Sequence, residues 1–105
     1  MKIEAFINTE CFEWDNYNIN KILLKHSVNI NECEEALLGE IIITVDEKHS
    51  SAEQRYNALG ITTSQRLLFI VFTIRNKKIR VISARPMCKK EREVYYEKIK
   101  TNTQI

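Results

Sequence analysis

Arginine and lysine side chains gather in the last third of this 105-residue chain, and this charge is its strongest chemical signal. Residues 75–105 hold 10 Lys+Arg and 3 Asp+Glu, whereas residues 1–74 hold 6 and 11. The net charge of +2 therefore conceals a balance of −5 followed by +7. Such asymmetry is typical of a surface that binds a polyanion, although solvated strands and a lysine-rich helix would give the same counts.

Few other residues indicate chemistry. Cys11, Cys33 and Cys88 form no CxxC pair and no zinc spacing, so we expect three reduced thiols, no metal and no cofactor. The N-terminus has no long apolar run, which predicts neither a signal peptide nor a membrane span and favours the cytoplasm.

The length fits one domain, residues 1–105. Residues 1–9 lack periodicity, so we expect a frayed end or an extra N-terminal segment over residues 1–11. A short strand is predicted over 11–14, followed by a helix that Asp15 or Asn16 caps. One face of this helix is expected to consist of Ile19, Ile22, Leu23 and His26. A second short helix is predicted from Asn31, paired with Glu34, to Gly39.

Four strands are predicted next, over 41–45, 54–62, 67–74 and 78–85. Asn76-Lys77 separates the last two at the spacing of a tight hairpin. Pro86 ends the sheet, and a final helix follows over 89–100. The expected fold is α+β: two N-terminal helices, a four-stranded antiparallel meander and a C-terminal helix.

Four ordered segments carry a family resemblance. They are Phe12-Glu13-Trp14-Asp15 with Lys25-His26 and Glu34-Glu35-Ala36; His49-Ser50 with Glu53-x-Arg55-Tyr56-x-Ala58-Leu59-Gly60; Val71-Phe72-Thr73-x-Arg75; and Ile79-Arg80-Val81-Ile82-Ser83-Ala84-Arg85-Pro86 with Lys89-Lys90-Glu91-Arg92 and Tyr95. Together they span about residues 12–97, and the chain resembles the BrnT family of type II toxins, which have a RelE-like fold. Ser27 stands where the family usually has Gly, and Cys88 stands where it often has Thr or Ser.

The resemblance implies a ribonuclease that cleaves RNA without a metal. It also implies a BrnA-like antitoxin with a ribbon-helix-helix domain, which silences the toxin in a heterotetramer and connects it to operator DNA. Members that have lost activity would instead be non-catalytic modules that bind nucleic acid or protein through a basic sheet. A DNA-binding regulator is a weaker third hypothesis, because no recognition-helix pattern is present.

Metal-free cleavage needs groups that neutralise the phosphate and accept the 2′-hydroxyl proton. The candidate catalytic residues are Arg85, Arg55, Lys25, His26 and Glu91. Arg85 ranks first, since it stands between the last strand and the final helix; its alternative is a salt bridge to Glu91 or Glu53. His26 could be a general base, but a structural role at the helix end is slightly favoured. Lys25 is expected to point elsewhere than His26, where it could reach a phosphate.

A second set of basic and aromatic side chains is expected to bind RNA. It comprises Arg75, Arg80, Lys89, Lys90, Arg92 and Tyr95. Strand parity points Arg80 and Arg85 to opposite faces unless a bulge intervenes. Packing and capping explain Glu91 and Tyr95 at least equally well. His49 lies in a polar loop, where it could be a base, but a solvated loop residue is the safer interpretation.

Overall fold

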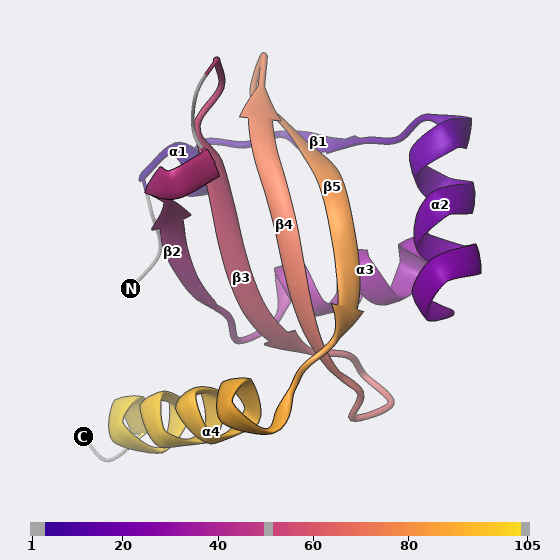
Figure 1. The fold of residues 1–105 in the computed structure, drawn as a ribbon. Helices are drawn as coiled ribbons and strands as arrows, with labels where there is room; N and C mark the ends of the chain where they lie inside the picture. The colour runs from indigo at the N-terminus through magenta and orange to yellow at the C-terminus, as the bar shows by residue number, and fades with distance from the viewer. Residues whose placement is uncertain (1–3, 50–51, 104–105) are drawn as a thin grey trace.

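The structure is a computed structural model that describes residues 4–49 and 52–103. Four helices, a 3-10 turn and five strands follow one another along the chain (Figure 1). In order, they are α1 (Glu4–Ile7), β1 (Cys11–Glu13), α2 (Asn16–His26), α3 (Ile30–Leu38), β2 (Ile42–Asp46), η1 (Glu47–His49), β3 (Arg55–Ile61), β4 (Leu67–Arg75), β5 (Lys78–Pro86) and α4 (Lys89–Thr103). The α+β class expected from the sequence is confirmed.

The sheet has five strands in the order β1-β5-β4-β3-β2, one more than the expected four-stranded meander. Strands β2 to β5 form the antiparallel meander, and β1 adds a parallel strand that pairs Cys11–Glu13 with residues 78–80 of β5. The sequence predicted the short strand β1. It did not predict the pairing of β1 with β5, because no local sequence pattern indicates a partner so far along the chain.

Because β1 covers only the start of β5, the rest of that strand edge is left for α2 (Figure 1). The Asn18 amide nitrogen of α2 donates to the Val81 carbonyl of β5 over 3.3 Å. Asp15 caps α2 as expected, accepting from the Asn18 backbone N–H over 2.8 Å. This edge position brings the last turn of α2 beside the end of β5.

One face of the sheet is buried under α1 and α3, with Phe72, Leu68, Ile70 and Leu37 among the fully enclosed side chains. Gly60 lets α3 approach, because a Cβ there would lie 2.9 Å from the Ala36 carbonyl oxygen. The first described residues join this core rather than fraying. Phe6 of α1 is 7% exposed and its ring lies 5.7 Å from that of Phe72.

Two helix boundaries differ from the sequence prediction. The cap of α3 is Asn29, which forms a reciprocal capping box with Glu32, so the predicted start at Asn31 is wrong. The Asn29 side chain accepts from the Glu32 backbone N–H, so the helix begins two residues earlier than predicted. Leu23 was expected in the apolar stripe of α2, yet it is 46% exposed because α2 covers an edge and not a face.

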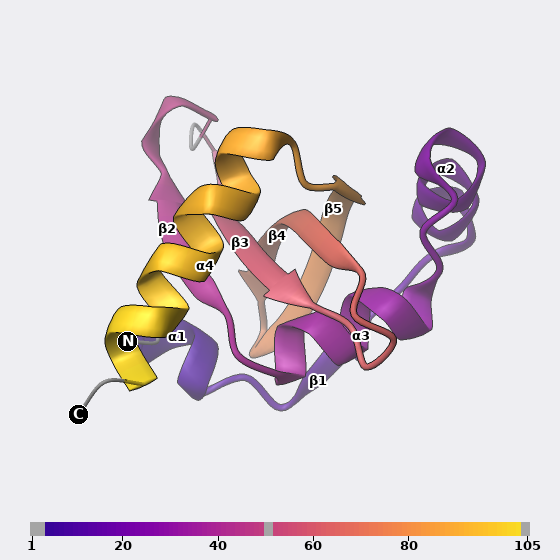
Figure 2. The ribbon, with the colours of Figure 1, turned by 90° about the horizontal axis from the view of Figure 1, so that it is seen from below.

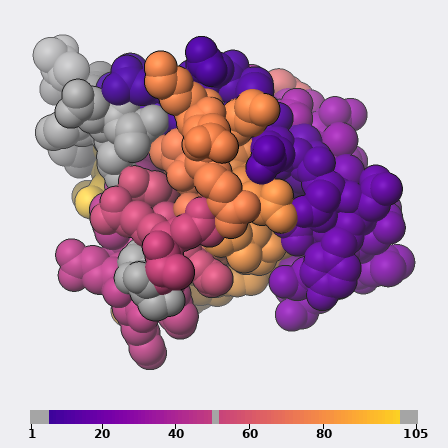
Figure 3. All heavy atoms as spheres, turned by 90° about the horizontal axis from the view of Figure 1, so that it is seen from above, coloured from indigo at the N-terminus to yellow at the C-terminus, as the bar shows by residue number. Residues whose placement is uncertain are grey.

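The opposite face of the sheet is bordered rather than covered. Helix α4 crosses it at one end and η1 lies at the other (Figures 1 and 2). Tyr95 anchors α4 by donating its hydroxyl to the Glu40 carbonyl over 2.8 Å. Figure 3 views the end that carries the β4–β5 turn, where β5 lies between α2 and the residues near η1. Within the described residues, no helix is long and apolar enough to cross a membrane.

Candidate functional site

The sheet face between α4 and η1 is called here the open face, and three rows of paired residues form it. In order from η1 to α4, the rows are Arg55–Thr73–Arg80, Asn57–Val71–Ser83 and Leu59–Phe69–Arg85. A bulge in β5 makes this arrangement possible. Val81 pairs with Phe72 and Ser83 with Val71, so Ile82 is the extra residue. The bulge restores Arg80 and Arg85 to one face, the exception that strand parity had left open.

Arg85 forms one wall of a hollow of about 240 Å³ between β5 and the last turns of α2. We call it the Arg85 hollow, and its lining residues are Lys21, Ile22, Lys25, His26, Ser83, Ala84 and Arg85. Three of the five expected catalytic residues, Arg85, Lys25 and His26, therefore line one cavity. Lys25 does not point elsewhere as expected, and Lys21 is an addition that the sequence pattern did not single out.

The Arg85 guanidinium is held in one orientation. Its two terminal nitrogens donate to the two carboxylate oxygens of Glu91, each over 2.8 Å, and it lies 4.3 Å from the centre of the Phe69 ring. Glu91 also accepts from the Cys88 backbone N–H over 2.9 Å. The hydrogen bonds from Arg85 lower the pKa of Glu91, and the same pair raises the pKa of Arg85. The salt bridge weighed as the alternative for Arg85 is thus present.

The end of α2 is fixed by a second arginine. Arg66 donates to the Ser27 carbonyl over 2.8 Å and to the His26 carbonyl over 3.2 Å, while pairing with Glu32. Ser27 adopts the left-handed conformation that a Gly would adopt without strain, with φ of 54°, so its replacement of Gly does not change the turn. Lys25 and His26 are consequently presented from a rigid helix end. Within the described residues, neither Lys21 nor Lys25 forms a salt bridge.

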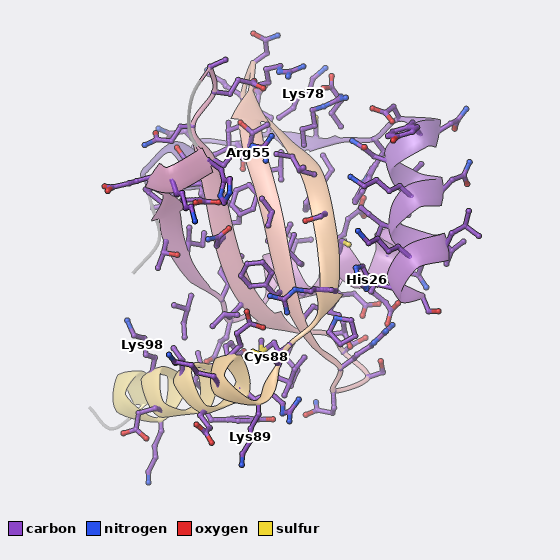
Figure 4. All side chains as sticks on the ribbon, in the orientation of Figure 1. His26, Arg55, Lys78, Cys88, Lys89 and Lys98 are labelled. Atoms are coloured by element: carbon purple, nitrogen blue, oxygen red, sulfur yellow. The ribbon has the colours of Figure 1, made fainter. Side chains whose placement is uncertain are left out.

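The other end of the open face carries a second hollow of about 280 Å³, called here the Arg55 hollow. Its lining residues are Asn18, His49, Ala52, Glu53, Arg55, Thr73, Arg75, Arg80 and Ile82. Figure 4 shows Arg55 near η1 and His26 between α2 and the other half of β5. Since four residues of strand separate the row of Arg55 from that of Arg85, the two hollows lie about 13 Å apart along the sheet.

Two arginines of the Arg55 hollow are paired with acidic side chains, of which Glu53 lines the hollow itself. Arg75 donates twice to Glu53 over 2.6 Å, and Arg80 donates to Asp15 over 2.6 Å and to Glu13 over 3.3 Å. The bond from Arg75 lowers the pKa of Glu53. The pKa of Asp15 is lowered first by the Asn18 N–H and then by Arg80. This hollow therefore contains basic residues without a clear excess of positive charge.

His49, which lines the Arg55 hollow, was expected from the sequence to be a solvated loop residue. Its Nδ1 lies 3.0 Å from Asp46 Oδ2, while the imidazole remains 58% exposed. An imidazole held by a carboxylate at one nitrogen can exchange a proton at the other. The spacing of Asp46 and His49 on the 3-10 turn was the available signal, because residues three apart share a face there.

Helix α4 divides the remaining expected RNA-binding residues between two sides. Lys90 faces the open face with Val94 and Lys98, four residues apart. Lys89 and Arg92 lie on the other side, and Arg92 donates to the Met87 carbonyl over 3.0 Å. Tyr95 is only 2% exposed, so its side chain packs in the interior. Packing was the alternative to RNA binding for this residue.

No group of three or more His, Cys, Asp or Glu side chains suited to a metal gathers within residues 4–49 and 52–103. Among the thiols, Cys33 is enclosed, and this burial raises its pKa to about 12. Cys11 and Cys88 are exposed.

The sequence and fold were compared with known proteins. The model of a family described as "Ribonuclease toxin, BrnT, of type II toxin-antitoxin system" matches residues 14–91. The 1.1 Å crystal structure of the Brucella abortus ribonuclease toxin BrnT has a similar fold, with a TM-score of 0.56 and 20% sequence identity over 77% of this chain and 100% of that one. No curated protein matches in sequence. Because the family match covers most of the chain, including both hollows, the chain belongs to the BrnT family of ribonuclease toxins of type II toxin-antitoxin systems.

Proposed function

We propose that this chain is a metal-independent endoribonuclease and that the Arg85 hollow binds the scissile phosphate. The observation that carries the proposal is the convergence of Arg85, Lys21, Lys25 and His26 in one cavity. Two of these cations have no salt bridge within the described residues, so an RNA phosphate supplies the missing negative charge. Arginine and lysine at such a site stabilise the charge that develops on the phosphate in the transition state.

In the proposed reaction, the 2′-oxygen of the RNA attacks the adjacent phosphorus. His26 accepts the 2′-hydroxyl proton as the O2′–P bond forms. The P–O5′ bond breaks, and the Lys25 ammonium donates a proton to the leaving O5′. The products are a 2′,3′-cyclic phosphate and a free 5′-hydroxyl, and Lys21 and Arg85 neutralise the phosphate oxygens throughout.

Glu91 acts as a positioning residue in this scheme rather than as a proton donor. Its bidentate bond with Arg85 and its lowered pKa keep it ionised near neutrality. Arg85 still has N–H groups beyond those that Glu91 accepts, since a guanidinium carries five donors. Arg55, Arg75, Arg80 and Lys90 hold the flanking RNA backbone along the open face.

The partner in this proposal is a BrnA-like antitoxin with a ribbon-helix-helix domain. It inhibits by covering the basic open face, and its dimerisation would give a heterotetramer of two toxins and two antitoxins. Operator DNA is contacted through the antitoxin. An antitoxin complex that leaves the open face accessible to RNA would contradict this steric account.

The function is tested with purified protein and RNA in excess EDTA. Cleavage should persist, should stop when the 2′-hydroxyl at the cut site is replaced by hydrogen, and should leave a 2′,3′-cyclic phosphate. Loss of cleavage in EDTA, or cleavage of the 2′-deoxy substrate, would contradict the mechanism. Expressed alone in a bacterium, the chain should arrest growth.

A non-catalytic binding module is the second candidate. It is favoured by the acidic partners that Arg75, Arg80 and Arg85 already have. Tight RNA binding without cleavage, together with normal growth on expression, would support this candidate against the ribonuclease.

A further inference from the structure

A crevice of about 260 Å³ lies between α4 and the open face, beside the Arg85 hollow but outside the proposed mechanism. Its apolar walls come from four elements: Ile42 of β2, Leu59 of β3, Phe69 of β4 and Val94 of α4. Small-ligand pockets commonly enclose about 300–1,000 Å³. The crevice is thus suited to a single aromatic ring system and not to a whole nucleotide.

Asn57 supplies the amide of this crevice, whose other polar lining residues are Thr44, Lys90, Glu91 and Lys98. It lies in the middle row of the open face, and its Oδ1 is buried without a hydrogen-bond partner. An amide oxygen in this state has lost its hydrogen bonds to water without gaining one from the protein, which is unfavourable. A buried polar atom without a partner in a folded protein calls for a ligand or another explanation.

The charges around the crevice favour an anionic ligand. Lys90 and Lys98 line it from α4, and Glu91 and Phe69 belong both to its lining and to the contacts of Arg85. A ligand with its ring in the crevice would therefore have its phosphate next to Arg85. Figure 4 shows Lys98 on α4 beside the sheet end.

We infer that this crevice binds the base of one RNA nucleotide and selects adenine. The inference rests on the proposed function, since it assigns a base to the strand whose phosphate occupies the Arg85 hollow. The base lies between the apolar walls, and Asn57 turns its amide toward the base edge. Aromatic and apolar surfaces hold unpaired RNA bases in this manner.

Adenine fits because its polar edge needs the one amide that the crevice offers. An asparagine amide accepts from the adenine N6 amino group and donates to the neighbouring ring nitrogen. Guanine presents two acceptors, O6 and N7, at the corresponding edge, so the amide oxygen of Asn57 would face an acceptor instead of a donor. The smaller pyrimidines would leave part of the crevice unfilled.

Binding is measured by ¹⁵N NMR titration of the intact chain with adenosine and uridine 5′-monophosphates. Adenosine monophosphate should shift the Asn57 side-chain amide and the Phe69 and Val94 resonances, and should bind about 10-fold more tightly than uridine monophosphate. Equal affinities, or shifts confined to other surfaces, would overturn the inference.

Two variants and a control sharpen the titration. Val94→Trp fills the crevice and should weaken adenosine monophosphate binding about 10-fold or more, whereas Tyr96→Trp, on the other side of the same helix, should not. Asn57→Leu should remove the preference for adenine and melt no lower than the wild type, because it deletes an unbonded oxygen. A preference that survives both Val94→Trp and Asn57→Leu would overturn the inference.

Cleavage mapping separates this inference from the proposed function. Cuts that cluster next to adenine and lose that preference in Val94→Trp support both. Cuts with no base preference would refute the adenine crevice and leave the ribonuclease standing. Adenosine monophosphate in the crevice of a chain that cuts no RNA would refute the ribonuclease and leave the crevice standing.

Discussion

The Arg85 hollow and the Arg55 hollow have similar size and share one sheet face, yet their charges are arranged differently. In the Arg55 hollow, Arg75 and Arg80 meet three carboxylates: Glu53, Asp15 and Glu13. In the Arg85 hollow, Arg85 is paired with one carboxylate, that of Glu91. Within the described residues, the two lysines that line this hollow form no salt bridge. A count of basic residues would rank the two equally.

This difference shows why local charge balance identifies a phosphate site better than the number of arginines. A phosphate entering the Arg55 hollow must compete with carboxylates that already satisfy the guanidinium groups. In the Arg85 hollow, it meets cations at a helix end fixed by Arg66. We therefore assign cleavage to the Arg85 hollow and flanking contacts to the Arg55 hollow.

The largest effect is expected from Arg85→Ala. It removes a charged donor to the phosphate and leaves Glu91 unpaired, so kcat for RNA cleavage should fall about 1,000-fold. Lys77→Asn is the matched control, because it also removes one positive charge and Asn tolerates the left-handed conformation of the turn. If the two variants cleave equally well, Arg85 has no special role.

The next effect distinguishes the two histidines. His26→Gln should lower kcat about 100-fold and abolish the rise in rate with pH that an imidazole base produces, while His49→Gln should preserve it. The measurement is a pH–rate profile of each variant in EDTA. Loss of the pH-dependent limb in His49→Gln alone would move the proton acceptor to the Arg55 hollow.

Loss of a single unpaired lysine should have a smaller effect. Lys25→Ala should reduce cleavage by no more than about 100-fold, the lower limit for loss of a general acid, because Lys21 and Arg85 still neutralise the phosphate. Arg55→Ala should mainly raise KM, since it contacts flanking RNA in this account. The comparison fails if Arg55→Ala lowers kcat more than Lys25→Ala does.

The smallest effect concerns stability. Glu91→Gln should lower the unfolding free energy by about 0.5–1 kcal/mol near neutral pH, after allowance for solvent screening of the partly exposed pair. Because folding lowers the pKa of Glu91 below its ordinary 4.5, this difference should be complete above that pH and vanish as the pH falls through the folded pKa. Thermal melts of both proteins from pH 7 to 3 test it; a gap that widens in acid would contradict the assignment.

Sequence patterns predicted the helices and strands of this fold better than the pairing of the strands and the contacts between elements. The β4–β5 turn was readable because Asn76 and Lys77 adopt the positive φ that its spacing requires. The parallel pairing of β1 was not, since it joins residues nearly 70 positions apart. The burial of Phe6 in the core depends on its contact with Phe72, which no local sequence pattern predicts.

The candidate site was predictable in its residue types but not in its grouping. Arg85, Lys25 and His26 were named from motifs, whereas their separation from Arg55 follows from the strand register. The bulge at Ile82 decides which arginines share a face, and strand parity alone could only allow for it. For His49, the sequence favoured a solvated loop residue over a base, and its contact with Asp46 at the end of β2 was not predicted.

The most direct test of phosphate binding is an NMR map of the intact chain with a non-cleavable RNA that carries one 2′-deoxy nucleotide. We expect the largest chemical-shift changes at Lys21, Lys25, His26 and the Arg85 guanidinium, with smaller changes at Arg55 and Arg75. Shifts centred on Arg55, Arg75 and His49, with the Arg85 hollow unmoved, would contradict it.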